Sequence, residues 1–387
     1  MRKRYLAVLL AVVLPFAIVA AGCGGDDEEA ATETGPAEAV SCTGSIAVMA
    51  PITGDAASIG QEQLNFVKFA VMRFNEENGT DFVLEEVDTQ LDPAQASTGA
   101  QQLVSNADIL GVVGPAGSQE VEAAGPIFEQ EPMTYVSGSA TATKLTDSGD
   151  FPSFFRTVPN DDAQGPTVGE FIAQTLAPSS VWVIDDQSSY STGLADSATA
   201  SLEEAGIEVM GESINQDQTD FSALVSRVAG TEVAFLPWQL GTQAQTFGQQ
   251  LAEQGADTVI VGGDGLFIED FSIKGSFVAS FAPDIKAIPE SAEFVEGYEA
   301  EFGEFTSTFG PPSYAAADAL LNAIQQACED AGGTPDRQQV LDAMRNVSID
   351  QSILGAPLSF ADDGDVEGGQ FFMFEVTGKG QYELQTG

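Results

Sequence analysis

Four loops rich in glycine and hydroxyl side chains are the part of this sequence best suited to binding a small ligand. Each follows a short apolar run, and they span residues 51–60, 114–118, 137–141 and 262–265. Glycine precedes Ser118, which opens a segment with a helical pattern. Free backbone N–H groups and the positive end of a helix dipole at such a turn suit a carboxylate. The alternative is that Ser118 is an ordinary N-cap and that the glycines only form turns.

The composition excludes several other kinds of chemistry. The 387 residues include 59 acidic side chains, 13 basic ones and no histidine. Without histidine the chain cannot build a Ser-His-Asp or Cys-His catalytic centre, or a His-ligated zinc or haem site. A formal charge of −46 excludes a nucleic-acid-binding surface, which needs lysine and arginine. Adjacent carboxylates such as Asp161 and Asp162 point to opposite faces of an extended segment, so they do not form a facing acid/base pair. We therefore expect no enzymatic activity, no metal and no cofactor.

Short apolar runs alternate with amphipathic stretches, and this alternation must position the loops. It occurs twice, over residues 45–136 and 167–261, and predicts parallel sheets covered by helices. The length favours two α/β lobes over one large sheet. The remaining predicted elements are helices without intervening strands, at 291–302, 312–331 and 335–346. Two strands follow them, at 370–376 and 381–385.

The first 22 residues have the pattern of an export signal. A basic start precedes an apolar run, which ends in small residues just before Cys23. This order is typical of a secretory signal peptide, and it resembles a bacterial lipobox in which Cys23 is lipidated. A membrane-spanning anchor is the alternative, but the run is short and contains Pro15. We expect a signal peptide at 1–22, an acidic tether at 23–42, and a body held outside the cytoplasmic membrane by lipid alone.

Besides Cys23, the sequence has two cysteines, Cys42 and Cys328. In an exported chain, two cysteines favour a disulfide, with two buried free thiols as the alternative.

Six segments stand out by their order and spacing: PITGDAASIG, VVGPAGSQEVEAAGPIFEQEPMTYVSGSATATKLT, FFRTVPNDDAQGPTVGEF, VWVIDDQSSYSTGLADS, DFSALVSRV and SYAAADALL. Together they resemble the type I periplasmic binding proteins of the leucine/isoleucine/valine-binding branch, over about residues 44–385. The resemblance implies two doubly wound parallel-sheet lobes, joined by three hinge segments, that close on a ligand. It assigns residues 43–160 plus 283–360 to one lobe and residues 161–282 plus 361–387 to the other. Both cysteines then fall in or beside the first lobe, which favours their pairing.

The resemblance also implies a binding site for an amino acid. Ser118, Ser139 and Thr141 match positions that hold the ligand's carboxylate and part of its ammonium group. Asp264 matches an acidic position that pairs with the ammonium, although the family commonly has glutamate there. The chemistry agrees, because a buried zwitterion needs both of its charges paired, by an anion site and an acid held close together.

The other implied positions surround the ligand. Asp161 and Tyr190 match positions on the first strand and a loop of the second lobe that line the cleft, and Phe309 matches an aromatic wall. Ile59 stands where tyrosine often occurs. Trp238 lies in a loop that lacks the usual Gly-Gly-Tyr-like pattern, and it either enters the cleft as an apolar wall or packs as an ordinary tryptophan. These departures support an amino acid as the ligand class better than leucine, isoleucine or valine in particular.

We therefore predict a lipid-anchored solute-binding protein that presents an amino acid to the permease and ATPase subunits of an ABC importer. Members of this family are usually monomeric. A sensor that signals to a membrane receptor is the alternative, because the same cleft would serve both functions. Amides, urea-like compounds and aromatic acids are alternative ligands, because relatives of this family bind them.

Overall fold

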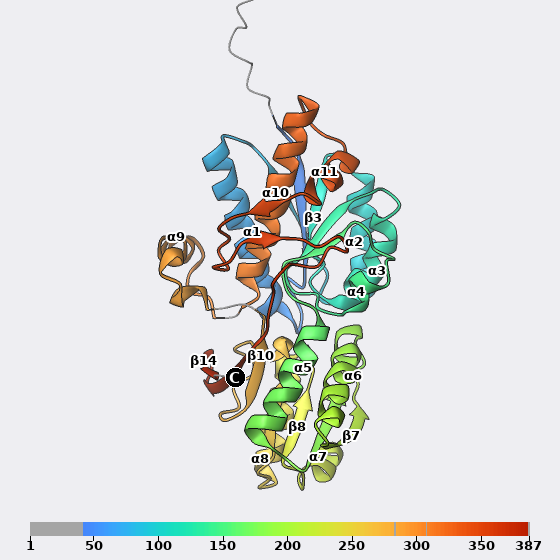
Figure 1. Ribbon diagram of the computed structural model, residues 1–387, viewed down its shortest axis with the longest axis vertical. Helices are drawn as coiled ribbons and strands as arrows, with labels where there is room; N and C mark the ends of the chain where they lie inside the picture. Colours follow the sequence, from blue (N-terminus) through green and yellow to red (C-terminus); the bar gives the residue numbers. More distant parts are fainter. Residues whose placement is uncertain (1–41, 282–283, 307, 386–387) are drawn as a thin grey trace, which may run out of the picture. The chain divides into compact units, whose positions relative to one another are not determined.

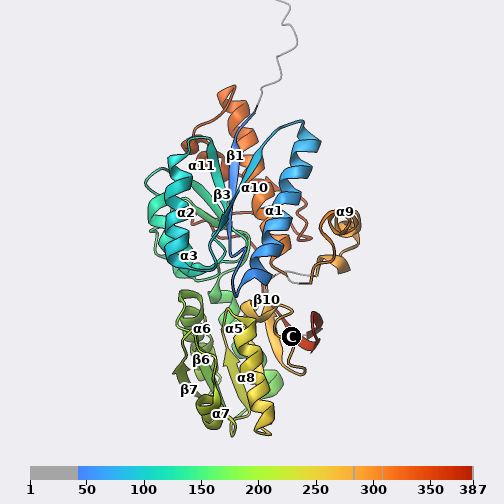
Figure 2. The same ribbon diagram turned by 180° about the vertical axis from the view of Figure 1, so that it is seen from behind.

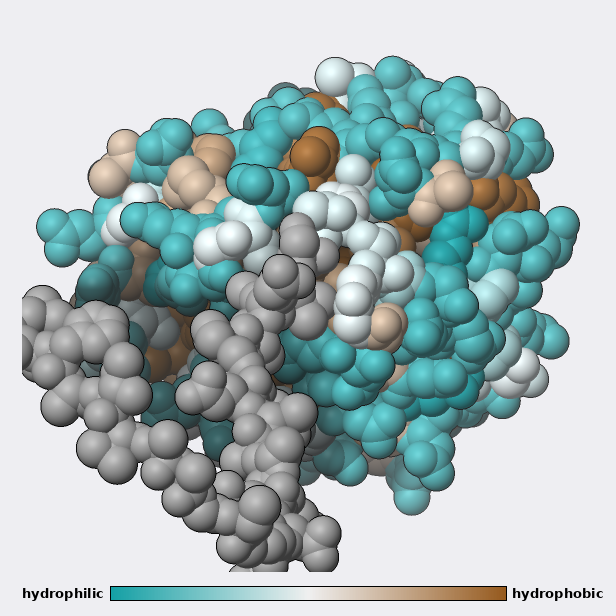
Figure 3. Space-filling model, turned by 90° about the horizontal axis from the view of Figure 1, so that it is seen from above, coloured by the Kyte–Doolittle hydropathy of each residue, from teal (hydrophilic) through white to brown (hydrophobic). Residues whose placement is uncertain are grey.

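The computed structural model describes residues 42–281, 284–306 and 308–385 (Figure 1). The predicted signal peptide, Cys23 and the tether as far as residue 41 lie outside the described residues. Among the helices that are described, none is both long and apolar enough to cross a membrane. The face shown in Figure 3 is largely hydrophilic, as the excess of acidic side chains leads one to expect.

Five parallel strands form the first sheet, in the order β2-β1-β3-β4-β5. Alternate residues of β1 face opposite sides of the sheet. Ile46 and Val48 join one hydrophobic core, and Ala47 and Met49 join another. β1 and β3 are therefore apolar almost throughout, as is usual for parallel strands covered on both faces. The strands are β1 (Ser45–Ala50), β2 (Val83–Asp88), β3 (Ile109–Val113), β4 (Thr134–Ser137) and β5 (Phe154–Arg156).

Helices cover both faces of this sheet, and together they form the first lobe. α1 (Ala57–Asn78) and α10 (Gly310–Ala331) pack side by side on one face (Figures 1 and 2). α2 (Pro93–Ser105) and α3 (Ser118–Phe128) cover the other face. Local signals set their ends: the Asp92 side chain caps α2, and Gly79 ends α1 with a left-handed φ of 66°. The lobe also contains α4 (Lys144–Asp147), α9 (Ala292–Phe302), α11 (Arg337–Met344), β11 (Ser348–Ile349) and β12 (Leu358–Ser359).

Seven strands form the second sheet, in the order β14-β13-β10-β9-β8-β6-β7. It is parallel from β7 to β10 and antiparallel where β13 and β14 join it. α5 (Asp161–Phe171) and α6 (Ser189–Glu204) pack on one face, and α7 (Ser222–Val228) and α8 (Gly241–Glu253) on the other. With these helices the sheet forms the second lobe. Its strands are β6 (Ser180–Asp185), β7 (Glu208–Ser213), β8 (Val233–Leu236), β9 (Val259–Gly262), β10 (Phe277–Ser280), β13 (Phe372–Gly378) and β14 (Gln381–Gln385). The predicted α/β architecture of two parallel-sheet lobes is confirmed.

The chain passes between the sheets after β5, after β10 and before β13. The third passage lies further along the chain than the lobe boundary expected at residue 361. The Arg156 N–H donates to the Gly364 carbonyl at 3.0 Å, and the Glu367 N–H donates to the Ser359 carbonyl at 3.0 Å. Residues up to Glu367 therefore belong with the first lobe. The physical reason is Asp365, whose carboxylate pairs at 2.5 Å with the fully buried Arg156 guanidinium.

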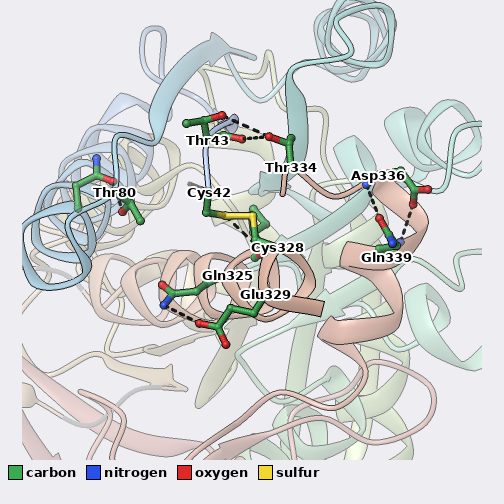
Figure 4. Close-up of a disulfide and its surroundings, with 11 residues drawn as sticks. Cys42, Thr43, Thr80, Gln325, Cys328, Glu329, Thr334, Asp336 and Gln339 are labelled. Atoms are coloured by element: carbon green, nitrogen blue, oxygen red, sulfur yellow. Dashed lines mark hydrogen bonds between the residues drawn. A yellow bond between two sulfur atoms is a disulfide. The ribbon is translucent and has the colours of Figure 1, made fainter. Parts of the chain in front are cut away.

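Cys42 and Cys328 form a disulfide, with their Cα atoms 5.7 Å apart (Figure 4). This bond ties the start of the described chain to α10. The hydroxyls of Thr43 and Thr334 lie 3.4 Å apart beside it. Of the two alternatives left by the sequence, the structure therefore contains the bridge rather than free thiols.

Candidate ligand-binding site

Two loops of the first lobe bring serine hydroxyls together at the carboxyl ends of β3 and β4. Ser118 opens α3, and its hydroxyl oxygen accepts a hydrogen bond from the Ala142 N–H at 3.2 Å. The Ser139 hydroxyl donates to the Ala116 carbonyl at 2.8 Å and accepts from the Gln63 side-chain amide at 2.7 Å. These bonds tie the two loops to each other and to α1. The hydroxyls are therefore held in place at the end of the sheet where parallel α/β proteins bind ligands.

Asp264 takes the corresponding place in the second lobe, in a short 3-10 turn directly after β9. It is only 3 % exposed, and its carboxylate accepts a hydrogen bond from the Tyr190 hydroxyl at 2.9 Å and another from the Gln164 amide. Glycine is required on both sides of it. A Cβ on Gly263 would lie 2.3 Å from the Tyr190 hydroxyl, and one on Gly265 would lie 2.5 Å from a backbone carbonyl.

Burial raises the pKa values of the titratable groups in this site. It raises the pKa of Asp264 from 3.8 to about 6, although the hydrogen bonds from Gln164 and Tyr190 oppose the shift. Burial, and then the neighbouring Asp264 carboxylate, raise the pKa of Asp161 well above its usual range. The Thr141 hydroxyl and the Arg156 guanidinium work against that rise. The pKa of the Tyr190 hydroxyl is also raised by burial and by Asp264, so it keeps its proton and donates.

Asp161 is the first residue of α5 rather than part of a strand. Its backbone N–H donates to the Thr141 carbonyl at 2.9 Å, which joins the first residue of the second lobe to a loop of the first. The Asp161 side chain is buried, and neither of its carboxylate oxygens has a hydrogen-bond partner of good geometry among the described residues. Such buried, unsatisfied groups are rare in native proteins and call for an explanation.

A pocket of about 30 Å³ lies where the two sets of loops meet. It is lined by six of the residues expected from the sequence, namely Ile59, Ser118, Ser139, Tyr190, Asp264 and Phe309. Leu91, Ala116, Gly117, Gln239 and Gly265 complete the lining. Thr141 and Asp161 are not part of this lining. They contact each other through the Asp161 N–H and the Thr141 carbonyl, and Asp161 is coupled electrostatically to Asp264.

The Trp238 ring lies elsewhere. It is fully buried in the second lobe, where it stacks on Phe221 and packs edge-on against Phe247. Its indole N–H donates to the Ile184 carbonyl at 2.6 Å. Trp238 is thus a packed core tryptophan, and the structure does not bring its ring to the pocket as an apolar wall.

Comparison with known proteins identifies the family of this chain. Its residues 43–381 match the periplasmic binding protein family. The chain belongs to this family. Within it, the protein is a type I, leucine-binding-protein-like substrate-binding protein of the ABC-transporter class. Proteins of this family bind and transport solutes and are not enzymes.

Several related proteins align with most of this chain. A leucine-, isoleucine-, valine-, threonine- and alanine-binding protein of Pseudomonas aeruginosa is 28% identical over 342 residues, which is 85% of this chain and 89% of that protein. A Leu/Ile/Val-binding protein homolog of Brucella abortus is 29% identical over 341 residues, with the same coverage of both chains. Among solved structures, a leucine-binding protein of Thermotoga maritima matches with a TM-score of 0.79 at 22% identity, covering 88% of this chain and 97% of its own.

The structure of this periplasmic binding protein adds three side chains to the expected site. Gln164 lies one helical turn after Asp161, so the two share a face of α5, and that spacing was a usable signal. Gln239 directly follows Trp238, in the loop that lacks the usual Gly-Gly-Tyr-like pattern. The sequence pointed to Trp238 as a possible wall of the cleft, whereas Gln239 lines the pocket. Leu91 had no sequence signal, because its position depends on an unusual backbone conformation. Within the described part of the chain, no group of three histidine, cysteine or acidic side chains is arranged to hold a metal ion.

Proposed function

We propose that this protein captures a free amino acid outside the cytoplasmic membrane, between its two lobes, and delivers it to an ABC importer. One observation carries the proposal. Hydroxyls of the first lobe, from Ser118 and Ser139, and the Asp264 carboxylate of the second lobe line one small pocket. The Ser118 hydroxyl, whose proton is not used within the described part of the protein, and the start of α3 suit the ligand's carboxylate, and Asp264 suits its ammonium group. The Ser139 hydroxyl donates its proton to the Ala116 carbonyl, so it offers the ligand only an acceptor.

The charge of the pocket favours a zwitterion over a simple acid. Among the described residues that line the pocket none is basic, whereas Asp264 lines it and the buried Asp161 is coupled electrostatically to Asp264. A ligand that carries only a carboxylate would leave both buried acids without a cationic partner, which is costly. A related structure from Rhodopseudomonas palustris holds 3,4-dihydroxy benzoic acid, so aromatic acids remain a necessary part of the test.

Apolar side chains complete the site. Ile59, Leu91 and Phe309 line the pocket beside the polar anchors, which suits an amino acid with an apolar side chain. The relatives from Pseudomonas aeruginosa and Brucella abortus are named for such ligands, leucine, isoleucine and valine among them.

The remaining parts of the proposal concern partners and location. We expect a monomer that meets permease and ATPase subunits, tethered by a lipid on Cys23. Transport is favoured over sensing because a structural relative from Streptococcus pneumoniae is described as the substrate binding protein of a branched-chain amino acid transporter.

Thermal unfolding of the purified protein against a ligand panel tests the proposal. The panel contains the twenty amino acids, short-chain amides, urea, benzoate and 3,4-dihydroxybenzoate. A ligand present at about 100 times its Kd adds about 2.7 kcal/mol, which raises the Tm by several degrees. We expect this shift with at least one amino acid, its loss in Asp264→Asn, and its retention in the matched control Asp257→Asn, which changes an exposed acid of the same lobe.

Two outcomes contradict the proposal. A shift with benzoates or amides but with no amino acid would show that Asp264 does not pair with an ammonium group. The absence of a shift with every amino acid, at concentrations up to several millimolar, would show that free amino acids are not the ligand.

A further inference from the structure

Glu120 is a buried acid of the first lobe to which the proposed function assigns no role. It lies two residues after Ser118 in α3, and its side chain is fully buried. Its Oε2 atom accepts a hydrogen bond from the Gly117 N–H at 2.6 Å. Gly117 lines the pocket and directly precedes Ser118. The Glu120 carboxyl group is therefore attached by one hydrogen bond to the loop that carries the proposed carboxylate anchor.

This carboxyl group lacks a partner for a negative charge. Its Oε1 atom lies beside the Thr89 hydroxyl, and both atoms are buried without a hydrogen bond of good geometry among the described residues. Lys144, a basic side chain beside the same helix, pairs at 2.7 Å with Glu122 instead. A neutral carboxyl group fits this arrangement, because its O–H can donate to the Thr89 oxygen while Oε2 still accepts from the Gly117 N–H.

The surroundings of Glu120 favour its neutral form. Burial contributes most to a rise in its pKa from 4.5 to about 7. The charged groups that act on it are also acids, Asp92 at the N-cap of α2 and Asp88 at the end of β2, and both add to the rise. The Gly117 bond and the nearby Thr89 hydroxyl oppose it.

A carboxylate bound at Ser118 places a second negative charge at the same end of α3. That carboxylate and an ionised Glu120 would compete for the positive end of one helix dipole. Like charges in a buried site also disfavour each other's ionised form. The ligand therefore favours the neutral form of Glu120, and by reciprocity the neutral form favours the ligand.

An ionised capping glutamate is the structural alternative. Glu120 accepts its hydrogen bond from the N-cap residue Gly117, as the glutamate of a capping box does. A carboxylate in that position stabilises a helix through the dipole. Glutamate is almost never fully buried unless its charge is paired, however, and Glu120 forms no ion pair with a described basic side chain.

We propose that Glu120 is neutral whenever an amino acid is bound, so that the protein takes up a proton at Glu120 together with its ligand at and above neutral pH. The inference rests on the proposed function and adds a titrating residue in the first lobe to Asp264 in the second. The two act in opposite directions, because Asp264 must lose a proton to pair with the ammonium group and Glu120 must keep one beside the carboxylate. Affinity should therefore be highest between about pH 6 and pH 7.

Calorimetric titration of the purified protein with alanine, leucine and phenylalanine tests this. With a pKa of about 7, roughly half of Glu120 is neutral at about pH 7 and roughly one-thirtieth at about pH 8.5. The loss of affinity is thus at most about twofold at pH 7, and the apparent Kd should increase about 15-fold from there to pH 8.5. In buffers of different ionisation enthalpy, binding at about pH 7.5 should take up roughly three-quarters of a proton.

Glu120→Gln separates the proton from the shape of the side chain. It keeps an acceptor for the Gly117 N–H but cannot ionise, so it should bind without proton uptake. At about pH 8.5 it should bind roughly 30-fold more tightly than the native protein, because all of it is neutral. Glu131→Gln is the matched control, because it removes an exposed glutamate just beyond the end of α3 and should keep the native pH dependence.

Thr89→Val provides a second test of the same group. The Thr89 hydroxyl lowers the pKa of Glu120, so its removal should move the fall in affinity to higher pH. The ligand's own ammonium group titrates equally in every variant, so the comparison between proteins cancels its contribution.

The outcomes separate this inference from the function on which it rests. Binding by the native protein without proton uptake above pH 7, or the native slope in Glu120→Gln, would overturn the role of Glu120 and leave amino-acid capture standing. If neither protein bound any of the three amino acids, the proposed function would fail, and this inference with it. Thermal unfolding checks that each variant is folded, and the native proton uptake together with Thr89→Val decides should Glu120→Gln be unstable.

Discussion

The raised pKa of Asp264 predicts how ligand affinity depends on pH. In the empty protein this carboxyl is buried beside the Tyr190 hydroxyl and the Gln164 amide, and its pKa is about 6 instead of 3.8. An ammonium group pairs with the ionised carboxylate and not with the neutral acid. A protonated Asp264 must therefore release its proton when an amino acid binds, and affinity should rise with pH through about 6.

The size of the effect follows from the fraction of protein in the competent, ionised state. With a pKa of about 6, roughly nine-tenths of Asp264 is ionised at about pH 7 and roughly one-tenth at about pH 5. The apparent Kd is the intrinsic Kd divided by this fraction, so it should increase about tenfold between the two conditions. The pKa of Asp161 is also raised, by burial and by Asp264, so any proton that it releases makes the dependence steeper.

Calorimetric titration between about pH 5 and pH 7, in buffers of different ionisation enthalpy, measures both the Kd and the number of protons released. In Asp264→Asn the affinity should fall by roughly 30-fold to 5000-fold, as expected from a loss of about 2–5 kcal/mol when one partner of a buried charge pair is removed. Its pH dependence should be reduced to the part that comes from Asp161. An affinity that is flat in the native protein, or an equal slope in Asp264→Asn, would refute the reasoning. A simple carboxylic acid should show the reverse trend, because acidification removes the charges that repel it.

Three further predictions follow from buried groups. Burial raises the pKa of Asp264 from 3.8 to about 6, so its ionisation lowers the stability of the folded protein progressively between about pH 4 and pH 6. Asp264→Asn should therefore stabilise the empty protein at neutral pH by up to about 3 kcal/mol, with little gain near pH 4, in urea titrations. Replacing Cys42 and Cys328 by serine opens a loop of 286 residues and should cost about 4 kcal/mol, with the ligand preference unchanged in calorimetry. Asp365→Asn leaves the Arg156 charge unpaired and should cost about 3 kcal/mol. It should also weaken ligand binding, because Arg156 holds the carbonyls of the loop that carries Thr141, and an unchanged Kd would limit its role to stability.

The regular alternation of apolar runs and amphipathic stretches was enough to predict most of the fold. The elements that escaped prediction have physical reasons. β5 has only three residues, too few for a pattern to emerge. α5 begins at Asp161, six residues before the predicted start at 167, because Pro166 lies inside the helix where a proline usually marks a boundary. The Asn160 side chain caps the true start.

The candidate site also has features that the sequence could predict and features that it could not. The loops that carry Ser118, Ser139 and Asp264 could be predicted because each follows a strand that the sequence identifies, and strand ends meet at one edge of a sheet. The roles of the three residues came from the family resemblance and stay predictions. The direction of a side chain within a loop is set by packing that the sequence does not display. Trp238 turns inward to Phe221 and Phe247, and Leu91 reaches the pocket only through a left-handed backbone.

The division of charges between the lobes explains why one ligand can hold them together. The hydroxyl anchors belong to the first lobe, and the coupled acids Asp161 and Asp264 belong to the second. The first lobe also has a buried acid, Glu120, whose carboxyl group accepts a hydrogen bond from the Gly117 N–H. A ligand bound to one lobe alone leaves one of its two charges unpaired, which is costly once water is excluded. Closure removes that cost only for a molecule that carries both charges at the spacing of an α-amino acid. Under the proposed function, we expect the same acids to raise the free energy of the closed, empty protein, so that closure with ligand is favoured over closure without it.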